Sequence, residues 1–190
     1  LSEAEVHWRA FLENLQARGM RGVGYVVSDD HAGLRAARRA VLGGATWQRC
    51  QFHLARNAIH HAPNLAIRKR IGAELREVWN AGSLAKAETA LVELVAGYRD
   101  TAPKLAAWLE TNVPEGLAVF SLPEHHRRRL RTSNPMERAV QQEIKRRTVK
   151  VRVFPNEASL ERLVSAVLVE IDDKWATDTK AYIKWECQDA

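Results

Sequence analysis

The sequence has little cysteine and no long apolar segment, and both shortages restrict what the protein can be. Cys50 and Cys187 are the two cysteines among 190 residues, and they lie far apart. Such a pair argues against a disulfide scaffold and suits a reducing cytosol. No apolar run approaches the roughly 18 residues that are needed to cross a bilayer. We therefore expect a soluble protein without a membrane partner.

Targeting and cofactor motifs are also missing. The first residues, Leu-Ser-Glu-Ala-Glu, lack the basic and apolar regions of a secretory signal, so we expect a cytoplasmic protein. No Gly-rich phosphate loop, nucleophile elbow or zinc-protease motif is present, and no small-molecule substrate is expected. The chain begins with Leu1 and not with methionine, which predicts that it is cut from a longer protein or processed. Apolar residues make up 46% of the composition, enough for a buried core.

Acidic residues are scarce in one segment, although the whole chain carries a net charge of only +6. Between positions 127 and 152, Glu137 and Glu143 accompany ten basic residues, so this segment carries +8 and the remainder −2. One basic segment in a near-neutral chain is typical of a surface that binds a polyanion such as DNA. A solvated helical face would explain the charges equally well. The basic residues are Arg127, Arg128, Arg129, Arg131, Arg138, Lys145, Arg146, Arg147, Lys150 and Arg152.

Two short apolar segments predict strands with a helix between them. Residues 23–27 read as a buried strand, residues 32–42 as a helix, and residues 45–50 as a second strand. This order implies a parallel pair with a right-handed crossover. Asp29 and Asp30 follow the first strand, where α/β folds place reactive groups.

After Cys50 the sequence is predicted to be helical almost throughout. Apolar residues recur at three- and four-residue spacing over several stretches, and the last of these continues for nearly five turns. Asn134-Pro135 is a good start signal for a further helix. The expected fold class is therefore α/β and predominantly helical. The predicted helices after the second strand cover residues 65–79, 84–98, 103–111, 134–147 and 160–175, and another covers residues 8–19.

Three carboxylates in these segments have a purely structural explanation. Asp29 or Asp30 could cap the helix that follows the first strand. Glu137 stands three residues after Asn134, which is the spacing of a capping box. Capping does not explain why arginines flank Glu137 on both sides. A carboxylate in a basic strip makes sense if the arginines bind phosphates and the carboxylate holds a metal ion beside them.

A zinc site is a weaker alternative. Cys50 and His53 offer two soft ligands at close spacing, and His60, His61 and Cys187 could complete the set. A structural zinc needs four convergent ligands, usually in two closely spaced pairs, and the second pair is missing. We favour Cys50 as a small buried residue at a strand end and His53 as a side chain that hydrogen-bonds nearby.

Four motifs occur in order along the chain. They are Val26–Leu34 (VVSDDHAGL), Trp47–Asn57 (WQRCQFHLARN), Arg131–Arg138 (RTSNPMER) and Phe154–Leu160 (FPNEASL). Together they resemble the Mutator-like transposases of bacterial insertion sequences, in the same order and with similar separations. The similarity spans nearly the whole chain, and four ordered motifs are far more specific than any one of them.

The resemblance implies a partial ribonuclease H-like core with an Asp-Asp-Glu active site and an all-α insertion before the glutamate. By motif, the second aspartate falls on Asp29 and the glutamate on Glu137, and both would be catalytic ligands of Mg²⁺ or Mn²⁺. Asp30 occupies a variable position and ranks below Asp29. The pair Cys50 and His53 matches a family signature, which weakens the zinc alternative. The implied division is a core over residues 1–60, a helical insertion over 61–125 and C-terminal core helices over 126–190.

The resemblance also implies a reaction and its partners. Water would cut at the transposon end, and the freed 3′-hydroxyl would attack target DNA, while the basic residues of the segment 127–152 contact phosphates. We expect a homo-oligomer that is associated with the bacterial nucleoid. The family's first aspartate lies upstream of anything present, so this fragment is expected to be inactive alone. The alternatives are a non-enzymatic DNA-binding or inhibitory fragment and, more weakly, a helical interaction module with a solvated basic helix.

Overall fold

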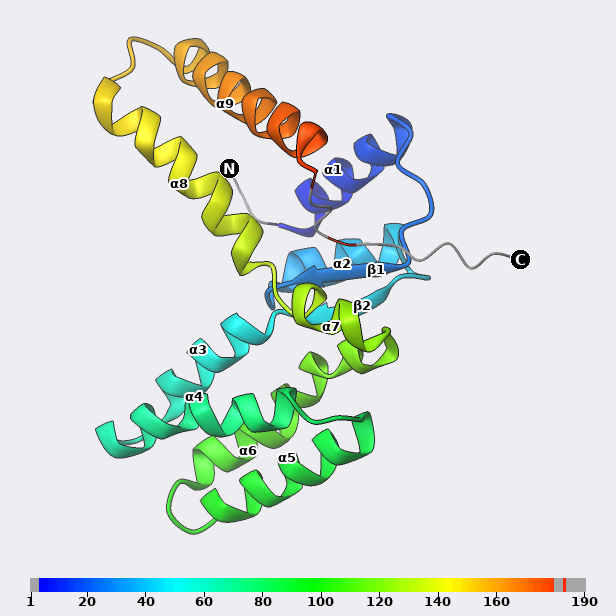
Figure 1. Ribbon diagram of the computed structural model, residues 1–190, viewed down its shortest axis with the longest axis vertical. Coiled ribbons are helices and arrows are strands. Elements are labelled where there is room, and N and C mark those ends of the chain that lie inside the picture. The colour runs from blue at the N-terminus through cyan, green and yellow to red at the C-terminus, as the bar shows by residue number, and fades with distance from the viewer. Residues whose placement is uncertain (1–3, 180–182, 184–190) are drawn as a thin grey trace. The chain divides into compact units, whose positions relative to one another are not determined.

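The structure is a computed structural model that describes residues 4–179 and 183. They form helices and a small parallel sheet (Figure 1). Contacts divide the chain into two compact units, residues 1–133 and 134–190. Within the described ranges, no helix is both long enough and apolar enough to cross a membrane. The predicted α/β class with a helical majority is therefore confirmed, whereas the ribonuclease H-like core and the predicted three-part division stay predictions.

The first unit begins with the helix α1 (Glu5–Ala17), which packs against α2 (Ala32–Val41). Gly19 ends α1, because its φ of 107° is a conformation that residues with a Cβ rarely adopt. The helix α2 connects the strands β1 (Tyr25–Ser28) and β2 (Thr46–Arg49). These strands pair in parallel, as the order strand, helix, strand predicts.

The second strand is tied to the helical part of the unit by one buried polar side chain. Gln48 is fully buried, and its amide nitrogen donates to the carbonyl oxygen of Gly116 at 2.7 Å. Its Oε1 accepts from the backbone nitrogen of Val119 at 2.6 Å. These partners lie in the 3₁₀ turns η1 (Val113–Gly116) and η2 (Ala118–Ser121). A buried amide that satisfies both of its ends fixes the sheet against these turns.

The main hydrophobic core lies among four helices, α3 (Gln51–His61), α4 (Leu65–Trp79), α5 (Leu84–Tyr98) and α6 (Pro103–Asn112), which pack against one another (Figure 1). Side-chain oxygens of Asn64 and Ser83 cap α4 and α5, which explains where these helices start. The helices predicted at 65–79 and 84–98 are confirmed. Core residues include Leu54, Ile71, Leu75, Val78, Leu91, Val95, Tyr98, Leu105 and Leu109.

The first unit ends with the short helix α7 (Glu124–Leu130). The second unit contains α8 (Asn134–Val151) and α9 (Glu157–Thr177), which pack against each other. Asn156 caps α9, because its side-chain oxygen accepts from the backbone nitrogen of Ser159 at 2.9 Å. Both predicted C-terminal helices are therefore confirmed, and α8 runs four residues further than expected, to position 151 instead of 147.

Candidate functional site

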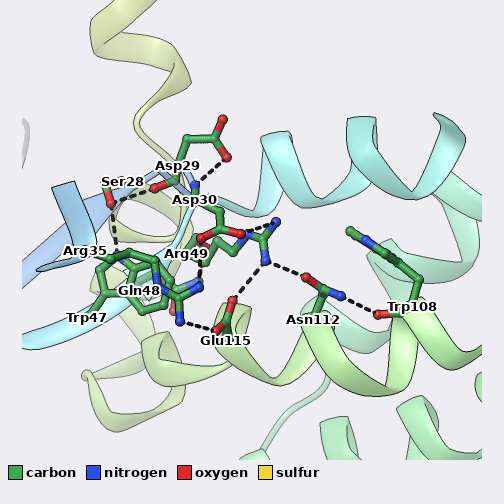
Figure 2. Close-up of polar contacts among 10 residues, drawn as sticks. All are labelled: Ser28, Asp29, Asp30, Arg35, Trp47, Gln48, Arg49, Trp108, Asn112 and Glu115. Atoms are coloured by element: carbon green, nitrogen blue, oxygen red, sulfur yellow. Dashed lines mark hydrogen bonds and ion pairs between the residues drawn. The ribbon is translucent and has the colours of Figure 1, made fainter. Parts of the chain in front are cut away.

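The two adjacent aspartates after β1 have different surroundings. Asp29 is exposed, and its Oδ1 accepts from the backbone nitrogen of Asp30 at 2.7 Å. Figure 2 shows that the Asp29 carboxylate points away from the neighbouring arginines. The carboxylate of Asp30 instead forms ion pairs with Arg35 at 2.7 Å and Arg49 at 3.3 Å. The oxygens of Asp29 are therefore accessible to a ligand, whereas arginines occupy those of Asp30.

Neither aspartate caps the helix that follows. The N-cap residue of α2 is His31, whose Nδ1 accepts from the backbone nitrogen of Leu34 at 3.3 Å. The capping explanation for Asp29 or Asp30 is therefore wrong. The helix starts later than a cap at either aspartate would require, and the Asp30 side chain turns toward the two arginines.

Arg49 links the aspartate loop to the helical part of the first unit. Its side chain is only 3% exposed, and it donates to Asn112 at 2.8 Å and to Glu115 at 2.9 Å, besides its ion pair with Asp30. Arg35 also contacts both carboxylates, reaching Glu115 at 2.8 Å. The hydrogen bond to Asp30, with help from the charge of Glu115, raises the pKa of Arg35. A buried charge needs such pairing, so this network fixes the loop.

A second set of contacts holds the backbone of Asp29. The indole nitrogen of Trp47, on β2, donates to the hydroxyl oxygen of Ser28 at 2.9 Å. That hydroxyl donates to the carbonyl oxygen of Asp29 at 3.0 Å. The guanidinium of Arg35 lies 4.6 Å from the centre of the Trp47 ring, within the range of a cation–π contact. Figure 2 shows these residues around the loop.

Glu137, the other predicted ligand, lies in the first turn of α8 and is exposed. A carboxylate there is favoured by the partial positive charge at the helix N-terminus. Asp29 belongs to the first unit and Glu137 to the second. Among the described residues, no group of three histidine, cysteine, aspartate or glutamate side chains is arranged to hold a metal ion. The capping and metal-binding roles of Glu137 both stay predictions.

The basic residues of the first unit do not all face solvent. Arg127 donates to a backbone carbonyl of the preceding turn at 2.9 Å, and its guanidinium lies 5.3 Å from the centre of the Phe120 ring. Arg131 donates to the side-chain oxygen of Asn80 at 2.9 Å. Burial, and then the charge of Arg128, lower the pKa of Arg131. Arg127 and Arg131 therefore have structural contacts, which the composition of the segment could not show.

Ion pairs also engage part of the basic segment in the second unit. Arg146 pairs with Glu143 at 2.7 Å, and Arg147 pairs with Glu170 of α9 at 2.6 Å. The first ion pair lowers the pKa of Glu143. Exposed side chains are the ones that can approach a phosphate most readily. The other exposed basic residues of the segment are Arg128, Arg129, Arg138, Lys145, Lys150 and Arg152.

Cys50 has a structural position at the end of β2. It is fully buried, its backbone nitrogen donates to the carbonyl oxygen of Ser28 at 2.8 Å, and its Sγ lies 3.2 Å from the Thr132 hydroxyl. The prediction of a small buried residue at a strand end is confirmed. His53 follows one turn later on α3 and is half-buried.

The zinc alternative fails on geometry for the described ligands. Cys50 and His60 lie ten residues apart along α3, which corresponds to about 15 Å of helix. His61 stacks on the ring of Trp108, with the ring centres 5.0 Å apart. Cys187 lies outside the described residues. The cysteine at one end of α3 and the histidines at the other end therefore cannot share one ion.

Sequence comparison places these motifs in a known group of proteins. The family described as "Transposase, Mutator family" matches residues 1–178. The chain belongs to the Mutator family of transposases. The resemblance drawn from the four motifs is thereby confirmed, and the match includes both Asp29 and Glu137.

Relatives of this Mutator-family chain are transposases of bacterial insertion sequences. It is 49% identical over 184 residues to the transposase for insertion sequence element IS406 of Burkholderia multivorans, covering 97% of the chain and 47% of that relative. It is 40% identical over 177 residues to the ISRM5 transposase of Rhizobium meliloti, covering 91% and 43%. For the transposase for IS256 in transposon Tn4001 of Staphylococcus aureus, the identity is 31% over 186 residues, covering 97% and 47%. The chain spans less than half the length of each of these relatives.

Proposed function

We propose that this chain supplies two metal-binding carboxylates, Asp29 and Glu137, to a transposase that cleaves and joins DNA strands. The observation that carries the proposal is the accessible carboxylate of Asp29 beside the carboxyl end of a parallel strand, within a family of transposases. Mg²⁺ and Mn²⁺ prefer oxygen ligands, and the donor set offered here fits them. The arginine pairs of Asp30 support Asp29 as the ligand of the two.

The proposed reaction has two steps at phosphorus. Water first attacks a phosphodiester at the transposon end, a new P–O bond replaces the bond to the 3′ oxygen, and that oxygen leaves as a hydroxyl. The hydroxyl then attacks a phosphodiester of target DNA in the same way. Bound metal ions would stabilise the charge on the attacking and leaving oxygens. The chain's own part is to hold Asp29 in place through the Arg49 network and to bind flanking phosphates with basic side chains.

We also propose that β1 and β2 belong to a larger ribonuclease H-like sheet. Among the described residues, β1 has a strand neighbour on one side only. A strand with an open edge favours pairing with a further strand. The helices α3 to α6, which follow β2 and precede Glu137, fit an insertion within such a core. We assign no residue of this chain as the family's first aspartate, so we propose that the chain alone does not cleave DNA.

The test is strand cleavage by this chain in its full-length natural context. A duplex that carries the transposon end is incubated with Mg²⁺, with Mn²⁺ or with a chelator. We expect nicking with either metal and none with the chelator. DNA binding without cleavage under every condition would contradict the enzymatic proposal and favour a non-enzymatic DNA-binding protein.

The exposed lysines of α8 support DNA binding in either case and give a separate prediction. Each phosphate contact that is lost reduces the slope of log affinity against log salt by about 0.9. We therefore expect Lys145→Gln and Lys150→Gln each to reduce the slope by about 1. Lys104→Gln, which removes an exposed lysine of α6 outside the basic segment, is the matched control and should leave the slope unchanged. Equal slopes in all the proteins would show that the basic helix is merely solvated.

A further inference from the structure

A hollow of about 510 Å³ lies between α3, α4 and the segment that follows α7, apart from Asp29. Its volume is within the range of pockets that enclose a small molecule. Phe52 and Arg56 contribute from α3, Arg76 and Trp79 from α4, and Arg131 from the segment after α7. Phe52 and Arg56 belong to the motif Trp47–Asn57, and Arg131 opens the motif Arg131–Arg138. Arg76 and Trp79 lie outside the four motifs, so the fold brings together residues from distant segments.

The charge of the hollow favours an anion. Three arginines line it, and no aspartate or glutamate is among the described residues of its wall. Arg56 and Arg76 are exposed, so they can turn toward a ligand. Burial, and then the charge of the neighbouring Arg128, lower the pKa of Arg131. A guanidinium group can donate two parallel hydrogen bonds to two oxygens of one phosphate. A phosphate is therefore the anion that best matches these arginines.

The rest of the wall favours an aromatic group next to that phosphate. Phe52 is 45% exposed although it lies among arginines. An exposed ring offers a stacking surface to a nucleic-acid base. Trp79 Nε1 and Gln51 Oε1 are buried and have no hydrogen-bond partner within the part of the chain that the structure describes. Both atoms are enclosed, so the exposed ring of Phe52 is the feature of the wall that favours a base.

A glycine keeps the hollow open. Gly72 lies in the middle of α4, where glycine is less favourable than alanine, and a Cβ at this position would meet no atom within 4 Å. Packing therefore does not require glycine here. A second hollow of about 450 Å³ shares Trp79 and Arg131 with the first and adds Arg127, Arg128 and the acidic Glu124. Arginines therefore line both neighbouring hollows. Such a series could bind successive phosphates of one DNA strand.

We propose that this hollow binds an unpaired nucleotide of DNA, with its base against Phe52 and its phosphates at Arg56 and Arg76. A duplex keeps its bases stacked inside the helix, so a pocket of this kind distinguishes unpaired from paired nucleotides. The proposal rests on DNA as the substrate of the proposed function. It does not require Asp29 or Glu137 to bind a metal ion.

The test compares two labelled duplexes that differ by one unpaired central nucleotide. Binding to the full-length natural protein is measured by fluorescence anisotropy in a chelator, so that cleavage does not contribute. We expect the duplex with the unpaired nucleotide to bind about tenfold more tightly, as loss or gain of one stacked base predicts. Phe52→Ala removes the stacking ring, and Gly72→Gln fills the hollow while it favours the helix. Both should abolish the preference and leave affinity for the paired duplex within about twofold.

Matched controls make the outcomes distinct. Phe11→Ala removes an exposed phenylalanine of α1, and Gly97→Gln fills the space beside an exposed glycine of α5. Both should keep the preference. An equal affinity of the natural protein for the two duplexes would overturn the proposal, as would an unchanged preference in Gly72→Gln. If the metal assay showed no cleavage, a measured preference for the unpaired nucleotide would still support the proposal about the hollow. Cleavage by a protein that binds both duplexes equally would contradict that proposal and leave the proposed cleavage function intact.

Discussion

Replacing Asp29 with asparagine is expected to abolish metal-dependent cleavage, whereas replacing Asp30 with asparagine should leave most of it. An asparagine at position 29 keeps the size of the side chain but removes the charge and one oxygen that would bind the ion. We expect the cleavage rate to fall on the order of a thousandfold, equivalent to about 4 kcal/mol of transition-state stabilisation. Rates of nicking in Mg²⁺, measured for both variants in the full-length natural protein, check this expectation.

Asp30→Asn serves as the control for position and folding. Its carboxylate pairs with Arg35 and Arg49 and is 31% exposed, so we expect a loss of about 1–2 kcal/mol of stability and a modest loss of rate. Equal losses of activity in both variants would mean that the loop as a whole matters and that Asp29 has no separate role. A severe loss in Asp30→Asn alone would show that the assignment of the ligand is wrong.

The largest loss of stability is expected from Arg49→Met. The substitution keeps an apolar stem but leaves Asp30, Asn112 and Glu115 without the group that joins them. Breaking a buried ion pair costs about 3–5 kcal/mol, and since the two carboxylates are 31% and 26% exposed we expect the lower end. For a chain of this size, about 3 kcal/mol lowers the melting temperature by roughly 6–12 °C. Thermal unfolding followed by circular dichroism measures the shift.

Two further variants serve as controls for the stability loss of Arg49→Met. Arg39→Met removes an exposed arginine from α2 and should change stability by no more than about 0.5 kcal/mol. Arg49→Lys keeps the charge but loses the planar fork, so it should fall between the natural protein and Arg49→Met. A melting temperature of Arg49→Met as high as that of Arg39→Met would mean that the network contributes little to the fold.

Most of the secondary structure follows from local sequence. The strand before Asp29 is an apolar segment between polar residues, and the helices α4, α5 and α9 show apolar residues on one face with a capping residue at the start. Such signals act over a few residues, so they can be recognised without the fold. The turns η1 and η2 and the short helix α7 were not predicted, because residues 113–130 show no sustained period.

The surroundings of the candidate site could not be predicted in the same way. Arg49 and Glu115 lie 66 residues apart, and Arg35 and Glu115 lie 80 residues apart. Their contacts depend on how α6 and η1 return to the sheet, which no local pattern records. The motif that contains Arg49 marked its neighbourhood but not its role. The sequence likewise left a capping role open for Asp29, which the cap at His31 excludes.

In the basic segment, composition alone could not predict which side chains are exposed. Arg127 and Arg128 are adjacent and equivalent by charge, yet Arg127 contacts backbone carbonyls and the Phe120 ring while Arg128 is exposed. An arginine faces solvent when it stands on the side of the helix that is turned away from the core. Net charge therefore indicated a polyanion partner but could not select the side chains that reach it.

The proposed cleavage function is tested most directly at Glu137. A glutamate that only capped α8 would take no part in the reaction, whereas a metal ligand would be essential to it. Nicking of a transposon-end duplex in Mg²⁺ should be compared between the full-length natural protein and its Glu137→Gln variant. Glutamine can still complete a capping box, so the start of α8 should be preserved while the negative charge is lost. We predict that cleavage is lost while DNA binding and the melting temperature are retained. Equal cleavage by both proteins would contradict the role of Glu137 as a metal ligand.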